Sequence, residues 1–492
     1  MVNPKPKVWI ASVIIPACSG QVTTDGTTVV AGNATAVMLE DLSIDWGRSD
    51  VWSQPSPSVL TCTIWQSDRF QEANPTAATN YLYRAGNGTL VGDRLVAFFD
   101  TDSGVPSVRN ANGFAVPWRF FEGRISNADF KRLRVRTTNG LEDGWAIRIQ
   151  GSDQVSAVAQ CTPPLDLPAN QTMIQRADVL ASRASGANIR EIYFEAAYTA
   201  GRVKAVETKG RSLLDLVNDM YASFAHQYAY NPHRNVIIRI PAAYNHGSYS
   251  LRFGRRAPGD TVRLYAPRQV DNTGRQDPAD SDPYPSAYVG ACDVQGDVML
   301  SVDASQRIRT ILCKWFVAAN NADHVTEVQA QTTTSPNTLQ FESWYNDGVQ
   351  VDPIMADVKR KILAEGSRPF HPRIVWDTAR SGDVPDWETF MSLTLPMQSV
   401  RLLVLAGSPF SAALDVAPVW YPAGGTITLR RGKWLFSVDL APAPMTLAGS
   451  PITFTGLSGN ATGSTVTLGQ LDTSISSHDL RYISDPNVTT WS

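Results

Sequence analysis

Acidic residues occur in two short, turn-like groups whose spacing could hold a calcium ion. Asp100 and Asp102 precede Gly104, and a second group lies at Asp277, Asp280 and Asp282. Carboxylate oxygens in such turns are the ligands that Ca²⁺ prefers. Neither group supplies the full ligand set of a calcium-binding loop, so we interpret both as solvated turns.

The histidines do not predict a metal site either. Three of the six, His226, His233 and His246, lie in one region of the chain. Their spacing does not place them on one helical face, and a strand is predicted between the second and the third. A His-Glu-x-x-His motif is absent. We therefore predict no metal and no cofactor.

Motifs of the common catalytic centres are also absent. The chain has no Gly-x-Ser-x-Gly nucleophile elbow, no phosphate-binding P-loop and no Gly-x-Gly-x-x-Gly after a predicted strand. A glycosidase remains an alternative, because it needs only a suitably spaced carboxyl pair and the chain has 46 acidic residues. We predict that the protein is not an enzyme.

The densest basic stretch contains Arg252, Arg255, Arg256, Arg263 and Arg268, with two aromatic residues among them. Such a stretch can face a phosphate backbone. The alternative, which we prefer, is a solvated or subunit-facing loop. The net charge of -3 does not by itself indicate a nucleic-acid or membrane partner.

Length and composition predict several folded domains. The 492 residues suffice for about three domains of about 150 residues each. A hydrophobic content of 43% with 34 Gly and 31 Pro favours turn-rich β domains over disorder. None of the five cysteines forms a Cys-x-x-Cys motif. We interpret them as small buried side chains rather than as disulfides or zinc ligands.

The N-terminal segment loosely imitates a secretory signal. Lys5 and Lys7 precede the apolar segment 8–15. Pro4 and Pro6 interrupt the basic region and the apolar segment is short, so we predict a first β-strand instead. No other segment offers about 20 uninterrupted apolar residues, and we expect no membrane span.

Residues 1–165 are predicted to form an N-terminal β-barrel or sandwich domain, because alternating apolar segments are separated by turn residues. The segment 71–90 has the composition of a loop. Strand signals resume after it, so residues 70–145 are a candidate for a small barrel inserted into this domain. The expected strands lie at 8–15, 27–31, 36–46, 58–65, 94–99, 116–126, 131–136 and 144–150.

Residues 166–286 are predicted to form an α/β decorating domain with a linker at 254–286. A helix at 172–185 is expected to end at Gly186, with an apolar stripe of Met173, Ala177, Leu180 and Ala184. A helix at 213–226 begins after Ser212, whose partner in a capping box is Asp215. Its apolar face contains Leu213, Leu216, Val217, Met220 and Phe224, and a strand follows at 235–240.

Residues 287–440 are predicted to form a second β domain with one helix. The helix has Asp352 as N-cap and Pro353 as its first residue, and ends at Gly366. Its inward stripe contains Ile354, Val358 and Ile362. Strands are expected at 297–302, 307–318, 372–377 and 400–405, and a hairpin at 426–440 turns at residues 431–432. Residues 441–492 form a Thr/Ser/Gly-rich extension.

Several motifs resemble one protein family. Trp46-Gly47-Arg48-Ser49 leads through the irregular Gln54-Pro55-Ser56-Pro57-Ser58 into the next strand. Phe121-Glu122-Gly123-Arg124-Ile125, Gly432-Lys433-Trp434 and Asp439-Leu440-Ala441-Pro442 follow further along. In this order the motifs resemble those of minor tail proteins, at the tail tip or baseplate hub, from long-tailed actinobacterial phages.

The resemblance implies a mainly β fold with a smaller α/β part (α+β), built on tail-tube-like β-barrel or sandwich domains in a hub-like architecture. Residues 1–165 and 287–440 would be the two barrels. The implied function is that of a structural virion protein at the distal end of the tail, which extends or caps the tail tube and anchors the receptor-binding apparatus.

The implied partners follow from that function. They are copies of the chain in a ring, expected to be a trimer, and the neighbouring tail-tube, distal-tail and tape-measure proteins. DNA would be in contact only in transit, and no stable membrane insertion is expected. Host cell-surface glycans are a further candidate partner.

Aromatic side chains are enriched at interface hot spots, and Trp52 is the first candidate among the 13 tryptophans. The interface hypothesis includes Trp46, Arg48, Trp52, Gln54 and Pro55. Two alternative functions are a carbohydrate-binding adhesin, with residues 441–492 contacting the host surface, and a tail-associated peptidoglycan hydrolase.

Overall fold

The computed structural model of the chain describes residues 7–10, 13–16, 29–30, 38–48, 52–99, 108–109, 115–116, 118–137, 140–193, 201–232, 235–240, 248–253, 291–294, 298–301, 308–317, 322–329, 337–346, 351–352, 354–355, 358–359, 362, 371–377, 399–403, 420–430, 433–442, 452–453 and 465–466. Over these residues the fold is mainly β with a smaller α/β part, as predicted. Buried side chains form two hydrophobic cores, which we call the sheet core and the helix core.

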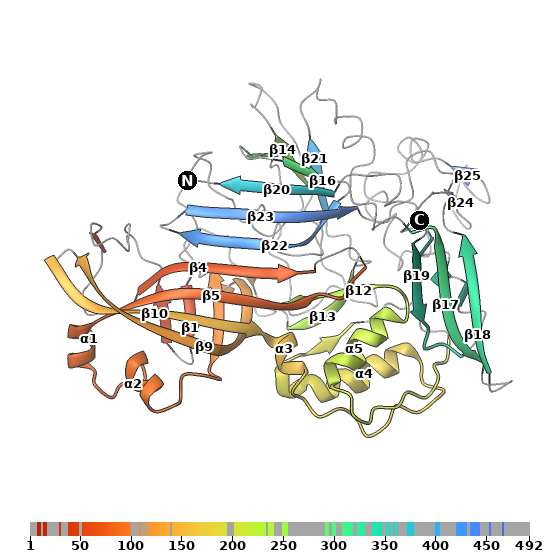
Figure 1. Ribbon diagram of the computed structural model, residues 1–492, viewed down its shortest axis with the longest axis horizontal. Coiled ribbons are helices and arrows are strands. Elements are labelled where there is room, and N and C mark those ends of the chain that lie inside the picture. Colours follow the sequence, from red (N-terminus) through yellow and green to blue (C-terminus); the bar gives the residue numbers. More distant parts are fainter. Residues whose placement is uncertain are drawn as a thin grey trace.

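One large curled sheet with fifteen strands dominates the described residues (Figure 1). Its middle consists of the antiparallel strands β4 (Met38–Gly47), β5 (Ser56–Ser67), β10 (Gly140–Asp153) and β9 (Trp118–Thr137). Beyond β9 the sheet continues with β6 (Arg94–Phe99), β1 (Lys7–Ile10) and β2 (Val13–Pro16), and β3 (Val29–Val30) pairs with the end of β9.

The same sheet takes strands from the C-terminal half of the chain. The predicted hairpin is confirmed as β22 (Trp420–Arg430) and β23 (Lys433–Pro442), and β22 pairs with β4. Ser43 Oγ lies 3.2 Å from Thr428 Oγ1 across this pairing, although the two residues are 385 positions apart. The other strands of this part are β14 (Ser248–Phe253), β15 (Ala291–Val294), β16 (Val298–Ser301), β20 (His371–Asp377) and β21 (Ser399–Leu403).

The sheet therefore contains strands from both predicted β domains and from the segment 70–145. The domain boundaries near residues 165, 286 and 440 stay predictions. The segments 254–286 and most of 441–492 lie outside the described residues, as do Asp100, Asp102, Asp277, Asp280, Asp282, His233 and His246. Within 441–492 the structure describes the short strands β24 (Ile452–Thr453) and β25 (Thr465–Val466).

Apolar alternation sets the register of the central strands. Cys62 of β5 lies between Leu42 of β4 and Ile149 of β10, and all three side chains are fully buried. Because successive strand residues point to opposite faces, a slip of one residue would bring all three out of the sheet core. The observed strands β4, β5 and β10 confirm the predicted strands 36–46, 58–65 and 144–150.

Three strand predictions were wrong in extent. The segment 8–15 forms two strands, because β1 and β2 fold back on each other with Ile10 opposite Val13. The segments 116–126 and 131–136 contribute to one 20-residue strand, β9, since its pairing with β10 continues through the residues between them. Residues 115–116 belong to the separate strand β8 (Ala115–Val116), which pairs with β7 (Val108–Arg109).

The predicted loop 71–90 contains helical residues instead. Both α1 (Asp68–Ala73) and α2 (Tyr81–Gly86) are too short to show an apolar helical stripe. They are held by tertiary contacts: Gln66 Oε1 accepts a hydrogen bond from Tyr81 N at 3.0 Å, and Gln66 Nε2 donates to Asn80 Oδ1 at 3.0 Å. Gln66 and Tyr81 are fully buried.

The α/β part contains α3 (Gln154–Val158), α4 (Met173–Ala184), α5 (Leu213–Ala222) and a three-stranded sheet of β11 (Glu191–Ile192), β13 (Val236–Ile240) and β12 (Gln227–Asn231). The predicted apolar stripes of both long helices are buried. The end of the first helix differs from the prediction, because α4 continues into the 3₁₀ turn η1 (Ser185–Ala187) and the left-handed residue is Asn188. The second helix, α5, ends at Ala222 instead of residue 226.

A second three-stranded sheet packs on the helix core. It consists of β17 (Thr310–Val317), β18 (Ala322–Gln329) and β19 (Thr338–Glu342), with β17 in the middle. Val351 and Asp352 are already helical, so the predicted N-cap at Asp352 was wrong. Val351 is fully buried. The predicted stripe of Ile354, Val358 and Ile362 is buried, as expected.

The structure tests the predictions on cysteines and membrane spans only for the described residues. Cys62 and Cys313 are buried and free, and Cys161 is free and half-buried. Among the described helices none is long and apolar enough to span a membrane.

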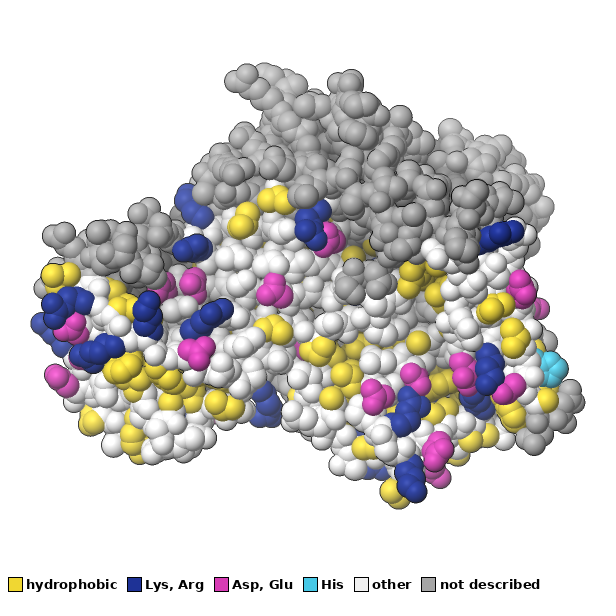
Figure 2. Space-filling model, in the orientation of Figure 1, with side chains coloured by type: hydrophobic (Ala, Val, Ile, Leu, Met, Phe, Trp, Pro, Cys, Tyr) yellow, Lys and Arg dark blue, Asp and Glu magenta, His cyan; other side chains and the backbone are white. Residues whose placement is uncertain are grey.

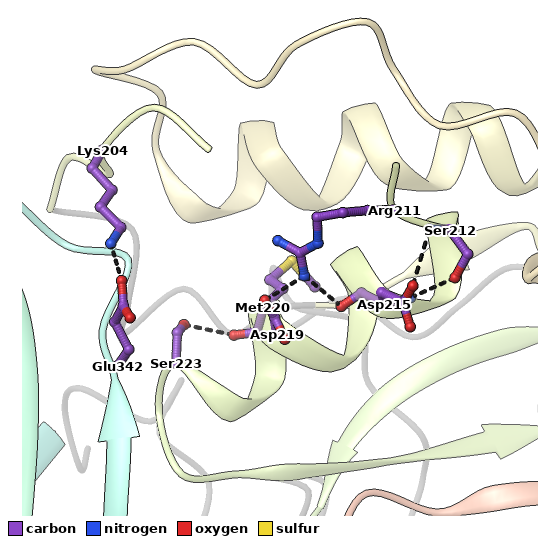
Figure 3. A network of polar contacts seen from close by, with 8 residues as sticks. All are labelled: Lys204, Arg211, Ser212, Asp215, Asp219, Met220, Ser223 and Glu342. Carbon is purple, nitrogen blue, oxygen red and sulfur yellow. Dashed lines mark hydrogen bonds and ion pairs between the residues drawn. The ribbon is translucent and has the colours of Figure 1, made fainter. Parts of the chain in front are cut away.

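Polar contacts connect α5 with its surroundings (Figure 3). Ser212 Oγ accepts a hydrogen bond from Asp215 N at 3.1 Å, and Asp215 Oδ2 accepts one from Ser212 N at 3.0 Å, which confirms the capping box. Arg211 pairs with Asp219 one turn further along the helix. Lys204 pairs with Glu342 at the end of β19, and this ion pair ties the second small sheet to the α/β part.

Ser212→Ala removes the side-chain cap of α5. We expect the free energy of unfolding to fall by about 1 kcal/mol, the usual cost of losing an N-cap, measured by urea denaturation. Ser182→Ala in α4 is the matched control, because Ser182 is exposed and bonds only the Val179 carbonyl. An equal loss in both variants would contradict a specific capping role.

Candidate functional site

The family-like motifs around Trp46–Pro55 and Phe121–Glu122 meet at one place, where the large sheet contacts the α/β part. A cavity of about 50 Å³ opens there, lined by residues of both parts that include Trp46, Arg48, Pro55, Glu122, Asp153 and Tyr228. We call this region the junction. Three of its lining residues, Trp46, Arg48 and Pro55, belong to the predicted interface group.

The Trp46-Gly47-Arg48 turn forms where the end of β4 crosses β22 closely. Gly47 has φ +91°, and a Cβ placed there would lie 2.2 Å from Gly424 Cα. Arg48 N donates to Ala423 O at 3.2 Å. Pairing registers shift on both strands at this point. The glycine is therefore required both by its positive φ and by the close approach of the second backbone.

Trp52 and Gln54 bind the turn between α5 and β12. Gln54 Nε2 donates to the His226 carbonyl at 2.8 Å, and Gln227 Nε2 donates to the Trp52 carbonyl at 3.0 Å. Trp52 also packs against the helix core. All these contacts lie within the chain, and the proposed role of these residues in contacts between subunits stays a prediction.

Glu122 is the electrostatic centre of the junction. Its carboxylate is fully buried and pairs with Arg94 Nη2 at 2.7 Å and Arg119 Nη1 at 2.5 Å. Asn188 Nδ2, at the end of η1, donates to Glu122 Oε1 at 2.9 Å. Partners on β6, on β9 and in the α/β part thus share one carboxylate. The pairing offsets the large desolvation cost of a buried charge.

Gly123, next to Glu122, is a glycine for a steric reason. A Cβ on Gly123 would lie 2.0 Å from Ser152 O, so β9 and β10 approach too closely for any side chain there. Phe121 and Ile125 enter the sheet core. The Phe-Glu-Gly-Arg-Ile motif thus combines two core side chains, one buried charge and one close backbone contact.

Asp153 connects the large sheet with α3. Asp153 Oδ2 accepts a hydrogen bond from Ser58 N at 2.8 Å, and Oδ1 accepts from Val155 N at 3.1 Å and Ser156 N at 3.4 Å. Burial outweighs these hydrogen bonds and raises the pKa of Asp153 to about 6. Burial also raises the pKa of Tyr228, with a smaller contribution from the charge of Asp153.

Two polar side-chain groups belong to residues that line the cavity. Trp46 Nε1 and the Tyr228 hydroxyl are buried and have no hydrogen-bond partner among the described residues. A polar cavity needs only about 10–15 Å³ to hold a water molecule, so ordered water can satisfy both groups. The cavity is therefore large enough for a water molecule bonded to these two groups.

The chemistry of the two carboxylates favours a structural joint. Glu122 is held by two guanidinium groups and an amide, and Asp153 by three backbone N–H groups. Both side chains are thus engaged in binding other parts of the chain. No group of three or more His, Cys, Asp or Glu side chains able to hold a metal occurs within the part of the chain that the structure describes.

Sequence reasoning missed Glu122 and Asp153 as site residues. The signal for Glu122 was present, since a glutamate between Phe121 and Gly123 in an apolar strand must either face solvent or find cationic partners. Arg94, Arg119 and Asn188 carry no local signal, because their meeting depends on the tertiary fold.

No protein-family model and no curated protein matches the chain. Solved structures similar to it include a tail protein from Neisseria meningitidis MC58, with 11% identity, a TM-score of 0.47 and coverage of 88% of this chain and 96% of that one. The 43 kDa tail protein of prophage MuSo2 from Shewanella oneidensis has 10% identity and a TM-score of 0.44, with coverage of 90% and 97%.

A third similar structure is the E. coli c3393 protein, a type VI secretion component described as resembling the T4 tail proteins gp27 and gp5. It has 9% identity and a TM-score of 0.41, with coverage of 94% of this chain and 80% of that one. The chain is thus similar to tail proteins along most of its length. At these identities and TM-scores the similarity assigns neither a family nor a function.

Glu122→Gln leaves two arginines at the junction without their shared anion. We expect the free energy of unfolding to fall by about 3 kcal/mol, the usual cost of breaking a buried ion pair from one side, measured by denaturant unfolding. Asp129→Asn, an exposed acid on the same strand, is the control and should change it little. Equal effects would show that Glu122 does not hold the junction.

The raised pKa of Asp153 predicts a pH dependence of stability. Between about pH 4 and pH 6 the folded state keeps a proton that the unfolded state has released, so the free energy of unfolding falls as the pH rises. The difference between the ordinary aspartate pKa of 3.8 and the raised pKa of about 6 corresponds to roughly 3 kcal/mol over this window.

Asp153→Asn keeps a side-chain oxygen for the cap of α3 but cannot titrate. Unfolding curves measured from pH 4 to pH 7 should therefore lose this part of the slope in the variant. Identical slopes in the variant and the wild type would show that Asp153 is not the titrating group.

Proposed function

We propose that the chain is a structural protein of a phage tail, located at the distal end of the tail. The observation that carries this proposal is the convergence of two of the family-like motifs, those around Trp46 and Glu122. Trp46-Gly47-Arg48, Gln54 and Phe121-Glu122-Gly123 are distant in sequence and meet in one junction between the large sheet and the α/β part. Their resemblance to tail-tip motifs thus gains a common structural role.

The work of the protein is assembly, not catalysis. A junction held by a buried ion cluster fixes the relative position of two cores, which suits a subunit that transmits force. The side chains of Glu122 and Asp153 both bind other parts of the chain, which supports this interpretation. In the proposed assembly, copies form a ring, expected to be a trimer, which extends or caps the tail tube and anchors the receptor-binding apparatus.

The proposed neighbours are the tail-tube, distal-tail and tape-measure proteins. DNA passes the ring only in transit. Among the described residues, the edge strands of the large sheet have one side without a partner strand, the kind of edge that neighbouring subunits complete.

Immunogold electron microscopy of intact virions tests the proposal. Antibody against this chain should label the tail end opposite the head, and antibody against the major capsid protein serves as the control on the same grid. Label on the capsid, or label only in lysate material that carries no tails, would contradict the proposed function.

A further inference from the structure

Two strand edges lie at opposite ends of the molecule's longest axis (Figure 1). One is the free part of β9 in the long β9–β10 hairpin at the left, which we call the arm, and the other is β18 at the right. A subunit with complementary surfaces at its two ends can join head to tail with its copies. We therefore compared the two edges.

The edge of β18 is straight and carries no bulge, lysine or proline. Its eight residues pair only with β17 among the described residues, and the register runs from Val317–Ala322 to Thr310–Gln329 without a shift. Its sequence has no proline or lysine, and Val325 is 64% exposed. Monomeric proteins usually blunt such an edge with a bulge, a lysine or a proline.

One face of β18 is acidic. Asp323, Val325 and Glu327 alternate along the strand, so all three side chains lie on the same face, and all are exposed. Figure 2 shows acidic side chains at this right-hand end of the molecule. Lys314 of β17 pairs with Asp323, whereas Glu327 has no described ion pair.

The arm carries the opposite charge. Beyond its pairing with β6, β9 pairs with β10 on one side, and β3 contacts only its final residues on the other within the described chain. Arg132 and Arg134 share one face, with side chains 54% and 62% exposed. They pair with Asp68 and Asp143 but keep most of their surface in solvent. Figure 2 shows basic side chains gathered at this left-hand end.

Like charges oppose the pairing of each edge with its own copy. A two-fold antiparallel pair of β18 strands centred on Val325 sets Asp323 opposite Glu327. A pair of arms centred on Leu133 sets Arg132 opposite Arg134. Like charges directly opposite each other destabilise a strand pair, so neither self-pairing is favoured.

Pairing the arm with β18 avoids this repulsion. In an antiparallel register that sets Arg132 opposite Glu327, Arg134 falls opposite Val325, and the pairing ends before position 136, where β3 pairs with β9. We propose that the arm of one copy adds as a strand to the free edge of β18 in the next copy. This contact is heterologous, and repeated around an axis it closes a ring. It deepens the ring assembly proposed above, on which it rests.

Charge reversal tests the contact in purified full-length protein. The arm variant is R132E/R134E and the edge variant is D323K/E327K. We expect each to weaken self-association about tenfold or more, because reversed charges then face like charges. Sedimentation velocity across a concentration series measures the effect. The control exchanges an exposed pair elsewhere, R373E/D439K, and should assemble as the wild type does.

Mixing the two variants separates a head-to-tail contact from any other. The arm variant keeps an intact β18 edge and the edge variant keeps an intact arm, so the intact arm of one variant can bind the intact edge of the other. Association that appears only on mixing supports the proposal. Wild-type oligomers in both variants, no association in the mixture, or a wild type that is monomeric throughout would overturn it.

Folding is checked by circular dichroism and thermal unfolding of each variant. If a double variant fails to fold, Val325→Lys is used instead, because Val325 is exposed and its replacement removes no described polar contact. The lysine would face Arg134 and should weaken association in the same way. If oligomers persist in every folded variant while tail-end labelling succeeds, the proposed function stands and this contact is wrong.

Discussion

Glu122 places a full negative charge between two apolar cores, and the arrangement of the rest depends on it. A buried carboxylate is tolerated only when cationic and hydrogen-bonding partners replace its water. Arg94 and Arg119 supply the charge from the large sheet, and Asn188 supplies a donor from the α/β part. The two cores therefore meet in one position, the position that satisfies this carboxylate.

Close backbone contacts also bring the strands around Glu122 together. Gly47 and Gly123 let neighbouring strands approach at distances that any side chain would block. Asp153 then joins β5, β10 and α3 through backbone hydrogen bonds. Directional polar contacts fix orientation more strictly than apolar packing does, which is what a subunit of a repeating assembly requires. The arm and β18 lie at opposite ends of the molecule (Figure 1).

Local sequence signals predicted the elements whose cause is local. Neighbouring residues determine three features, and each was predicted. They are the capping box of Ser212 and Asp215, the apolar stripe of α4 and the β22–β23 hairpin. The helix α2 was missed because Gln66, fifteen residues away, holds its first turn. The division of 8–15 into two strands was missed because the apolar run has no turn residue with a strong signal.

The junction required tertiary information for a different reason. Its motifs were visible in sequence, but the partners of Glu122 come from three segments, and the partner of Gly47 lies in β22. A burial pattern predicts that a strand is covered without identifying what covers it. A charged residue within an apolar strand is the one local signal for such a junction. It indicates a buried ion pair only when the strand is known to lie in the middle of a sheet.

Native-state hydrogen exchange tests most directly whether the junction makes the two cores one cooperative unit. The account predicts that the slowest amides of β5 and β10 and those of α5 and β12 exchange with the same opening free energy, equal to that of global unfolding. Exchange of α5 and β12 through a separate opening of lower free energy, while β5 and β10 stay protected, would contradict it.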